Sequence, residues 1–451
     1  MTILVSMVVC NVKHRSGELV AYRVIFLLII SMLGVLSIAT AHVGGAPTAI
    51  FFYVYFVVLF LLFPPKYVIS PLTILYVYYG LWFWLAPLFA QRYADVSSNA
   101  YYSYSFVLIS IGLSIGVIFL YDSKNPRHSV NLPVEYENRT VRVPSKTVLA
   151  SLFSLSTLFV MLIVENSGGL GKWITSPGDA FLNRSGSGLY VVGSHFSSLA
   201  LAALCGYRAF VTGNKKVLYL FVVWLMLTSP VHGSKFQIAL LLIISLLPWL
   251  KDLRFYSKGS FVLGFVLLGV LFLGLYFRNI SWMTWSDLVP YTLNYFDTLD
   301  NLALSLNEFS PALNETFFMP FNKFLTPLGN DGGAMFYDMS QWLTSIYDPT
   351  AWKIRATIQF PVETDLYLNF YFYLGIPVLA LFFYVVAKIY SSAHRTQHLG
   401  AWFAAILMTL FMISHLRGSI YNHTEFYMYP YIFVMYFLLR KYKFPRGVSN
   451  V

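Results

Sequence analysis

Long apolar runs separated by short polar segments constrain this chain more than any other feature. Crossing about 30 Å of hydrocarbon takes roughly 20 apolar residues in a helix, and only a helix or a closed barrel satisfies its backbone hydrogen bonds in lipid. We therefore predict an all-α polytopic membrane protein with about twelve transmembrane helices. The expected spans are 24–41, 47–63, 68–90, 104–121, 147–165, 189–210, 217–230, 236–250, 261–277, 366–388, 400–415 and 427–440.

Two of these runs, 217–230 and 236–250, are short for a full crossing. They could instead form a re-entrant pair joined at Pro230 to Ser234, which leaves ten full spans. The pair begins and ends on the same side under either interpretation, so the rest of the topology is unchanged.

The composition excludes a soluble fold. Hydrophobic residues make up 58% of the chain and charged residues only 11%, whereas soluble domains carry roughly 25% charged residues. A net charge of +11 could indicate a nucleic-acid partner. The basic residues, however, lie in short loops between apolar runs, so we expect the lipid bilayer as partner and no nucleic acid. Cys10 and Cys205 imply no disulfide framework.

The distribution of charge predicts the orientation. Most of the 30 Lys and Arg residues fall in alternate loops, including 122–146, 251–258 and 440–446, and every loop of that set is basic. Short cytoplasmic loops carry such an excess of Lys and Arg, so we expect both termini in the cytoplasm. Most of the 19 Asp and Glu residues fall on the opposite, outer side.

One outer segment, 278–365, is about 90 residues long, and loops of this length are usually functional or form a small domain. The chain thus divides into helices 1–9 in residues 1–277, the large outer loop 278–365, and helices 10–12 with the cytoplasmic tail in 366–451. Three apolar stretches in the loop are expected to form short amphipathic helices on the membrane: Leu302 to Leu306, Phe317 to Phe321 and Trp342 to Ile346.

Motifs for several cofactors are absent from the sequence. It contains no Walker A loop, no HExxH and no paired CxxC, so we expect no ATP motor, no metal site and no cofactor. The first outer loop, Ala41 to Ala46, also has no acid. This counts against glycosyltransferases that bind a metal through a DxD motif in that loop.

Cations near the outer ends of spans are candidate binding groups, because ionisable residues in or near a bilayer are costly. We predict that Arg417, Lys235, Arg278 and Arg184 bind an anion such as a diphosphate. Each has a simpler interpretation. Lys235 and Arg278 could snorkel at a helix end, Arg417 could be an anchor paired with Glu425, and Arg184 could belong to a flexible Gly/Ser connector.

Candidate catalytic residues are Glu363, Asp365 and His423. Glu363 and Asp365 precede the run after the large loop, and either could be a general base or merely a helix cap. His423 follows Arg417 closely. Other ionisable residues near the outer face are candidates of lower rank: His195, His232, Arg355, His415 and Glu425.

The layout of the chain is about twelve spans with one dominant outer loop before the last few. Three short motifs accompany it: Gly233 to Leu240, a small-small-basic turn before an apolar run; Thr364 to Phe370 followed by Leu374 to Ile376; and His415 to Ser419, an Arg-Gly pair that ends a span. In this layout and in these motifs the chain resembles the bacterial O-antigen polymerases of the Wzy type.

The resemblance implies a metal-independent glycosyltransferase of the bacterial inner membrane. Such an enzyme polymerises undecaprenyl-diphosphate-linked oligosaccharide repeat units at the periplasmic face, and a chain-length regulator and a flippase act in the same pathway. The charge pattern suits this chemistry. A departing diphosphate needs cations near the membrane surface, and the acceptor hydroxyl needs a carboxylate or His as base.

Two alternatives remain open. An O-antigen ligase uses the same broad chemistry, but a His would be expected near the end of its large loop, and 278–365 contains none. A flippase or another transporter would be no enzyme. Transporters commonly show two similar halves, whereas here one loop dominates and no repeat is visible.

Overall fold

A computed structural model describes residues 46–87, 100–124, 141–176, 179–180, 186–232, 235–278, 284–286, 288–296, 298–313, 316–325, 336–353 and 357–445. In this part of the chain the fold is all-α. No strand is present, and the only extended pairings are two isolated bridges, Tyr67 with Arg254 and His398 with Lys443.

The long apolar elements follow the predicted runs closely, because each run ends at polar or helix-breaking residues. They are α3 (Ala46–Leu62), α4 (Pro71–Tyr79) continued by the π-helical turn η1 (Gly80–Leu85), α6 (Ala100–Lys124), α7 (Lys146–Asn166), α10 (Gly188–Thr212), α11 (Lys216–His232), α12 (Lys235–Leu250), α13 (Lys258–Arg278), α20 (Ile376–Thr396), α21 (Leu399–Leu416) and α22 (Glu425–Leu438).

Several of these helices could cross a membrane. Among the described residues, four helical segments are long and apolar enough: Lys146–Asn166, Gly188–Thr212, Tyr373–Thr396 and Leu399–Leu416. Six further apolar helices are shorter, and α11 and α12 belong to this group. The architecture is therefore that of an all-α membrane protein. The run at 24–41 lies outside the described residues, and the count of twelve spans stays a prediction.

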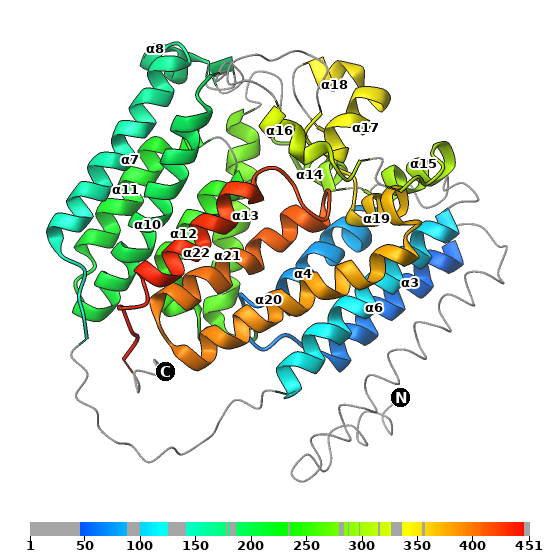
Figure 1. Ribbon diagram of the computed structural model, residues 1–451, viewed down its shortest axis with the longest axis horizontal. Helices are drawn as coiled ribbons and strands as arrows, with labels where there is room; N and C mark the ends of the chain where they lie inside the picture. Colours follow the sequence, from blue (N-terminus) through cyan, green and yellow to red (C-terminus); the bar gives the residue numbers. More distant parts are fainter. Residues whose placement is uncertain are drawn as a thin grey trace, which may run out of the picture.

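The helices pack in two flanks around a central pair (Figure 1). On one flank α10 packs against α7, α11 and α12; on the other α6 packs against α20, α4 and α3; α21 and α22 lie between them. Two glycines allow the closest crossings. A Cβ atom would lie 1.9 Å from the Ser245 carbonyl oxygen at Gly206, and 2.2 Å from that of Tyr436 at Gly400. Small residues of this kind let membrane helices approach through their backbones.

The predicted span 366–388 is wrong at its start. Helix α19 (Val362–Phe370) ends at a reversal in which Tyr371 and Phe372 have positive φ angles of 51° and 62°. A 3₁₀ turn, η4 (Tyr373–Gly375), then leads into α20, whose first turn contains Pro377. Phe372 stacks on Phe106 with ring centroids 3.9 Å apart, and this buried contact holds the reversal. The boundary expected between residues 365 and 366 therefore falls inside α19.

The described parts of 278–365 form short helices at one end of the bundle (Figure 1). Short helices form at all three apolar stretches expected to be helical. Their location on a membrane surface stays a prediction. The helices are α14 (Leu288–Phe296), α15 (Leu299–Glu308), η3 (Met319–Phe321), α16 (Asn322–Leu325), α17 (Met339–Tyr347) and α18 (Pro349–Lys353); α8 (Gly169–Thr175) lies at the same end of the bundle.

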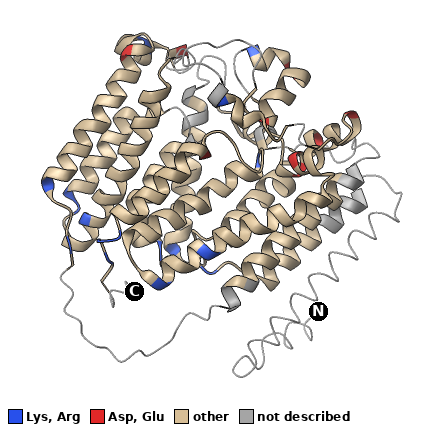
Figure 2. Ribbon diagram, viewed as in Figure 1, with Lys and Arg blue, Asp and Glu red and all other residues tan. Residues whose placement is uncertain are grey.

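Figure 2 shows that Lys and Arg gather at the opposite end of the bundle, which we call the basic end. Backbone contacts tie its loops together. Phe255 N donates to Lys66 O at 3.0 Å, and Leu399 N donates to Tyr442 O at 2.7 Å. Most of the Asp and Glu residues lie at the end that carries the short helices, which we call the acidic end. The alternate loops that the sequence groups by charge thus meet at one end of the fold.

Candidate functional site

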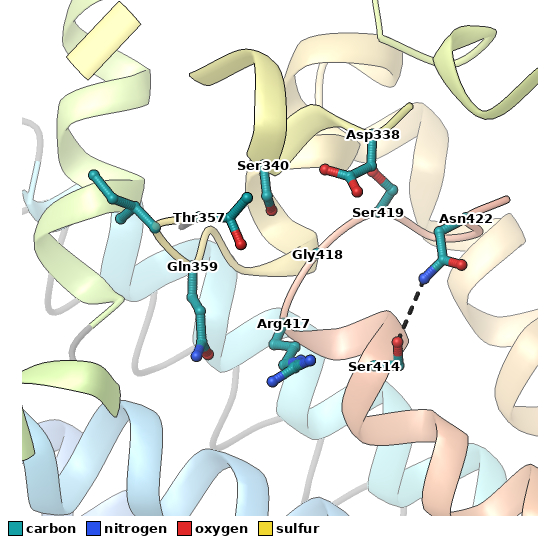
Figure 3. Close-up of a pocket in the computed structure, with 10 residues that line it drawn as sticks. Asp338, Ser340, Thr357, Gln359, Ser414, Arg417, Gly418, Ser419 and Asn422 are labelled. Carbon is teal, nitrogen blue, oxygen red and sulfur yellow. Dashed lines mark hydrogen bonds between the residues drawn. The ribbon is translucent and has the colours of Figure 1, made fainter. Parts of the chain in front are cut away.

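A cavity of about 130 Å³ lies at the acidic end, where four segments meet. Asp338 and Ser340 come from the start of α17, and residues 357–359 come from the segment before α19. Ser414 belongs to the last turn of α21. The loop that joins α21 to α22 contributes Arg417, Gly418, Ser419 and Asn422 (Figure 3). The cavity is lined mostly by polar side chains, which suits a polar or charged ligand rather than a lipid tail.

Arg417 is the cation of this cavity. It is the C-cap residue of α21, where the negative end of the helix dipole favours a positive charge. In the part of the chain that the structure describes, its guanidinium makes no hydrogen bond and no ion pair. The expected alternative, an anchor paired with Glu425, is wrong because Glu425 pairs with His415 instead. Arg417 is thus a half-buried cation available to an anion.

Two buried polar atoms of the lining also lack partners. Gln359 is 9% exposed and Ser419 7%. Gln359 Nε2 and Ser419 Oγ make no hydrogen bond. The other amide atom, Gln359 Oε1, accepts from Trp82 Nε1 at 2.9 Å, and this contact fixes the amide orientation. In Figure 3 the side chains of Gln359 and Arg417 extend in the same direction. A buried polar atom without a hydrogen bond lowers the stability of the fold by about 1–3 kcal/mol. A ligand that supplies hydrogen-bond acceptors to these two atoms would remove this cost.

Asp338 is the carboxylate of the cavity. It caps α17, and its Oδ1 accepts from Gln341 N at 2.8 Å. Burial raises the pKa of Asp338, while backbone donors and the nearby charge of Arg417 oppose that rise. Asp338 and Arg417 both line the cavity. This arrangement puts a group that can hold a proton opposite a group that can hold an anion.

Glu363 lies on the first turn of α19 and is fully buried. The Tyr79 hydroxyl donates to its Oε1 at 3.0 Å. Burial raises the pKa of Glu363 to about 7, although its own backbone N–H and the Tyr79 hydroxyl act to lower it. The carboxyl group is not part of the cavity lining.

Asp365 lies two residues further along α19, away from the cavity lining. Its Oδ1 accepts from Asn369 Nδ2 at 2.8 Å and from Thr316 Oγ1 at 3.2 Å. Its Oδ2 accepts from Ile420 N at 2.9 Å. Burial raises the pKa of Asp365 to about 6 against the effect of these donors. The carboxylate thus joins α19 to the loop that carries Arg417.

His423 lies near the cavity but does not line it. Its ring is 5.6 Å from that of Tyr337, over which Lys323 Nζ lies at 4.7 Å. Burial, followed by the charge of Lys323, lowers the pKa of His423 to about 4. The imidazole is therefore neutral at neutral pH and is a weak base.

His415 and Glu425 form a buried pair between α21 and α22, with His415 Nε2 3.1 Å from Glu425 Oε1. Tyr429 OH lies 2.6 Å from the same ring nitrogen. Glu425 Oε2 accepts from Asn422 N at 2.9 Å. These residues thus connect directly to the loop of the cavity.

The structure gives only the backbone positions of two other predicted cations: Lys235 begins α12 and Arg278 ends α13. Arg184 and Arg355 lie outside the described residues. His232 is buried at the end of α11 beside Thr228 Oγ1, at 3.1 Å. His195 lies within α10. Of the seven predicted site residues, the structure brings Arg417 to the cavity and Glu363, Asp365 and His423 near it.

Sequence reasoning did not single out Asp338, Gln359 or Asn422. Asp338 carries a recognisable signal, since Asp followed three residues later by Gln and then by an apolar stretch is typical of a helix start. Gln359 and Asn422 carry no such signal. No group of three or more His, Cys, Asp or Glu side chains that could hold a metal ion is found in the described ranges.

Comparisons with protein-family models, with curated proteins and with solved structures find no match for this chain.

Proposed function

We propose that this protein joins lipid-diphosphate-linked oligosaccharide repeat units into a polysaccharide at the outer face of a bacterial inner membrane. The observation that carries the proposal is Arg417, a cation without a partner among the described residues, in a cavity where Gln359 Nε2 and Ser419 Oγ also lack hydrogen-bond partners. A diphosphate is an anion rich in acceptors, and an arginine binds its oxygens with a bidentate fork.

The location of the cavity also favours this substrate. It lies at the end of apolar helices that could span a membrane, and the short helices α14 to α18 lie at the same end. A lipid-linked sugar has its diphosphate at such a level, with its tail in the bilayer and its sugars in water. The proposal includes about twelve spans, both termini in the cytoplasm and 278–365 in the periplasm.

In the proposed reaction, the two charged groups of the cavity, Arg417 and Asp338, have different roles. The acceptor sugar's hydroxyl oxygen forms a bond to C1 of the donor sugar, and the bond from C1 to the phosphate oxygen breaks. The electron pair leaves with undecaprenyl diphosphate, whose growing charge Arg417 stabilises with help from Gln359 Nε2. The hydroxyl proton passes to a carboxylate. Asp338 lines the cavity, so we assign it this role ahead of Glu363, Asp365 and His423.

The proposed reaction does not require a metal ion, because Arg417 stabilises the negative charge that develops on the leaving diphosphate. The substrate also carries its own leaving group, which suits a compartment without ATP or nucleotide sugars. The partners expected from the pathway are the lipid-linked repeat unit, a flippase that delivers it and a chain-length regulator.

Deletion of the gene followed by gel analysis of the surface polysaccharide tests the proposal. A product with one repeat unit on the core indicates a polymerase, and its conversion to long chains by the wild-type gene completes the test. A product with no repeat unit would instead indicate a ligase or a flippase. Purified protein given undecaprenyl-diphosphate-linked repeat units should make polymer, and it should do so equally in EDTA.

A further inference from the structure

The loop that carries Arg417 is held at one peptide, that of Ile420, from both sides. Asp365 Oδ2 accepts from Ile420 N at 2.9 Å. His415 Nδ1 lies 2.7 Å from Ile420 O. Since a carbonyl oxygen only accepts, Nδ1 carries the proton and donates. Ile420 is three residues after Arg417 and follows Ser419 directly, so these contacts fix the loop next to two groups of the cavity.

The Asp365 side chain is itself fixed by a second set of contacts. Asn369 Nδ2 donates to Asp365 Oδ1 at 2.8 Å. Asn369 Oδ1 accepts from the backbone N–H groups of Thr316 and Phe317, both at 3.0 Å. Both carboxylate oxygens of Asp365 thus accept from protein donors. Asp365 therefore connects the Arg417 loop to the segment before η3, and its oxygens are engaged away from the cavity.

The His415 ring is fixed in a similar way. Its Nε2 lies 2.6 Å from Tyr429 OH and 3.1 Å from Glu425 Oε1. Glu425 Oε2 accepts from Asn422 N at 2.9 Å. The loop is therefore attached twice on this side, at Ile420 through His415 and at Asn422 through Glu425. Both side chains are buried, so water does not compete for the contacts.

We propose that Asp365 and His415 are positioning residues, which hold the peptide of Ile420 so that Arg417 and Ser419 stay directed at the cavity. The restraint on the loop follows from the contacts, whereas its effect on polymer synthesis rests on the proposed function. Asp365 is then a residue that acts through Arg417 and not a general base.

Asp365→Asn changes one atom and tests the Asp365 contact. An amide has one acceptor oxygen, so its NH₂ group must face either Ile420 N–H or the Asn369 side chain. Hydrogen exchange of segment 417–424 should become about tenfold faster or more. Exchange in the buried helix α21, residues 401–412, should not change, which controls for folding.

A matched pair of substitutions tests the His415 contact. An asparagine amide nitrogen occupies nearly the position of His Nδ1, and a glutamine amide nitrogen that of Nε2. His415→Asn should therefore keep slow exchange in 417–424, and His415→Gln should lose it. Tyr429→Phe removes only the hydroxyl beside Nε2 and serves as the control for ring contacts.

Polymer synthesis by the purified variants completes the test. Loss of alignment by about 1 Å can lower a rate about 10²-fold, so Asp365→Asn and His415→Gln should lower kcat by that order. The pH profile should keep its shape, because under this proposal neither residue accepts the proton of the acceptor hydroxyl. Slow exchange with activity lost in Asp365→Asn would overturn the proposal, as would a pH profile that loses one limb. Fast exchange with full activity would also overturn it.

Wild-type protein that makes no polymer would refute the proposed function alone, since the exchange results stand without it.

Discussion

The basic end and the acidic end of this bundle differ in whether their polar groups have hydrogen-bond or ion-pair partners. At the basic end, loops are joined by backbone hydrogen bonds, Arg208 donates to the Pro144 carbonyl and Lys251 pairs with Asp252. At the acidic end, Arg417 has no partner among the described residues, and Gln359 and Ser419 each bury an unsatisfied atom. Satisfied groups stabilise a fold. Unsatisfied groups gathered around one cavity cost stability, so the acidic end is where a ligand is expected.

The largest effect expected from this comparison is all-or-none and concerns the side of the membrane on which each end lies. Reporter fusions after Lys146, Lys216, Lys258 and Arg395, at the basic end, should report the cytoplasm. Fusions at Asp179, Asn314 and Asn422, which belong to the predicted outer loops, should report the periplasm. A cytoplasmic signal from Asn314 would contradict the topology and with it the periplasmic site.

The next largest effect is expected at Arg417. Arg417→Ala should lower polymer synthesis about 10²- to 10³-fold, because the group stabilises charge that grows in the transition state. Arg417→Lys keeps the charge but loses the bidentate fork, so it should be impaired less than alanine. Long-chain polysaccharide in a deletion strain, at matched membrane abundance, measures both.

The control for Arg417 is Arg395→Ala, which removes an exposed cation from the basic end of α20. It should leave chain length unchanged. Normal chains from Arg417→Ala would reduce Arg417 to a helix-end group, and the diphosphate site would then have to involve Lys235 or Arg278.

A smaller effect is expected at Gln359, whose Nε2 has no partner. Gln359→Glu replaces this donor by a carboxylate oxygen, which would attract Arg417 and repel a diphosphate, so synthesis should fall roughly tenfold or more. Gln359→Met, of similar shape but uncharged, should lose less. Synthesis rates of the two purified variants give the comparison. Equal activity of the glutamate variant and the wild type would show that Nε2 does not face an anion.

The sequence predicted the helices well and the site only in part, for a physical reason. An apolar run is a local property, and the run 400–415 became α21 (Leu399–Leu416) almost unchanged. The error at 366–388 arose because the apolar pattern continues through a reversal made by Tyr371 and Phe372, without a glycine at either position. Their conformation depends on packing against α6, which no local pattern reveals.

The site depends on tertiary contacts even more strongly. Arg417 could be selected because a cation at the end of a span is costly wherever the chain folds. Asp338 and Gln359 become part of the same cavity only through the packing of the segment 278–365 on the bundle. The role of Asp365 was also hidden, because its partners Thr316 and Ile420 are distant in sequence.

The last effect concerns stability rather than activity and follows from Glu363. Its pKa is raised from 4.5 to about 7, chiefly by burial. Between these values the unfolded chain releases the proton while the folded protein keeps it, so this carboxyl stabilises the fold less as pH rises from about 4.5 to 7. Glu363→Gln cannot ionise and keeps the oxygen that accepts from Tyr79. The variant should therefore gain stability relative to the wild type across this range, by up to about 3 kcal/mol at 1.36 kcal/mol per pKa unit.

Thermal unfolding of the purified variants between pH 5 and pH 8 measures this gain as a melting temperature difference that grows with pH and levels off above pH 7. Glu165→Gln, at an exposed position at the end of α7, is the matched control and should show no such trend. A difference that stays constant with pH would mean that Glu363 is ionised in the folded protein throughout. Glu363 would then be a buried anion whose charge would partly offset that of Arg417, and the cavity would be less suited to a diphosphate. A growing difference would mean instead that Glu363 is protonated when the protein is most stable, which leaves the charge of Arg417 available to a ligand.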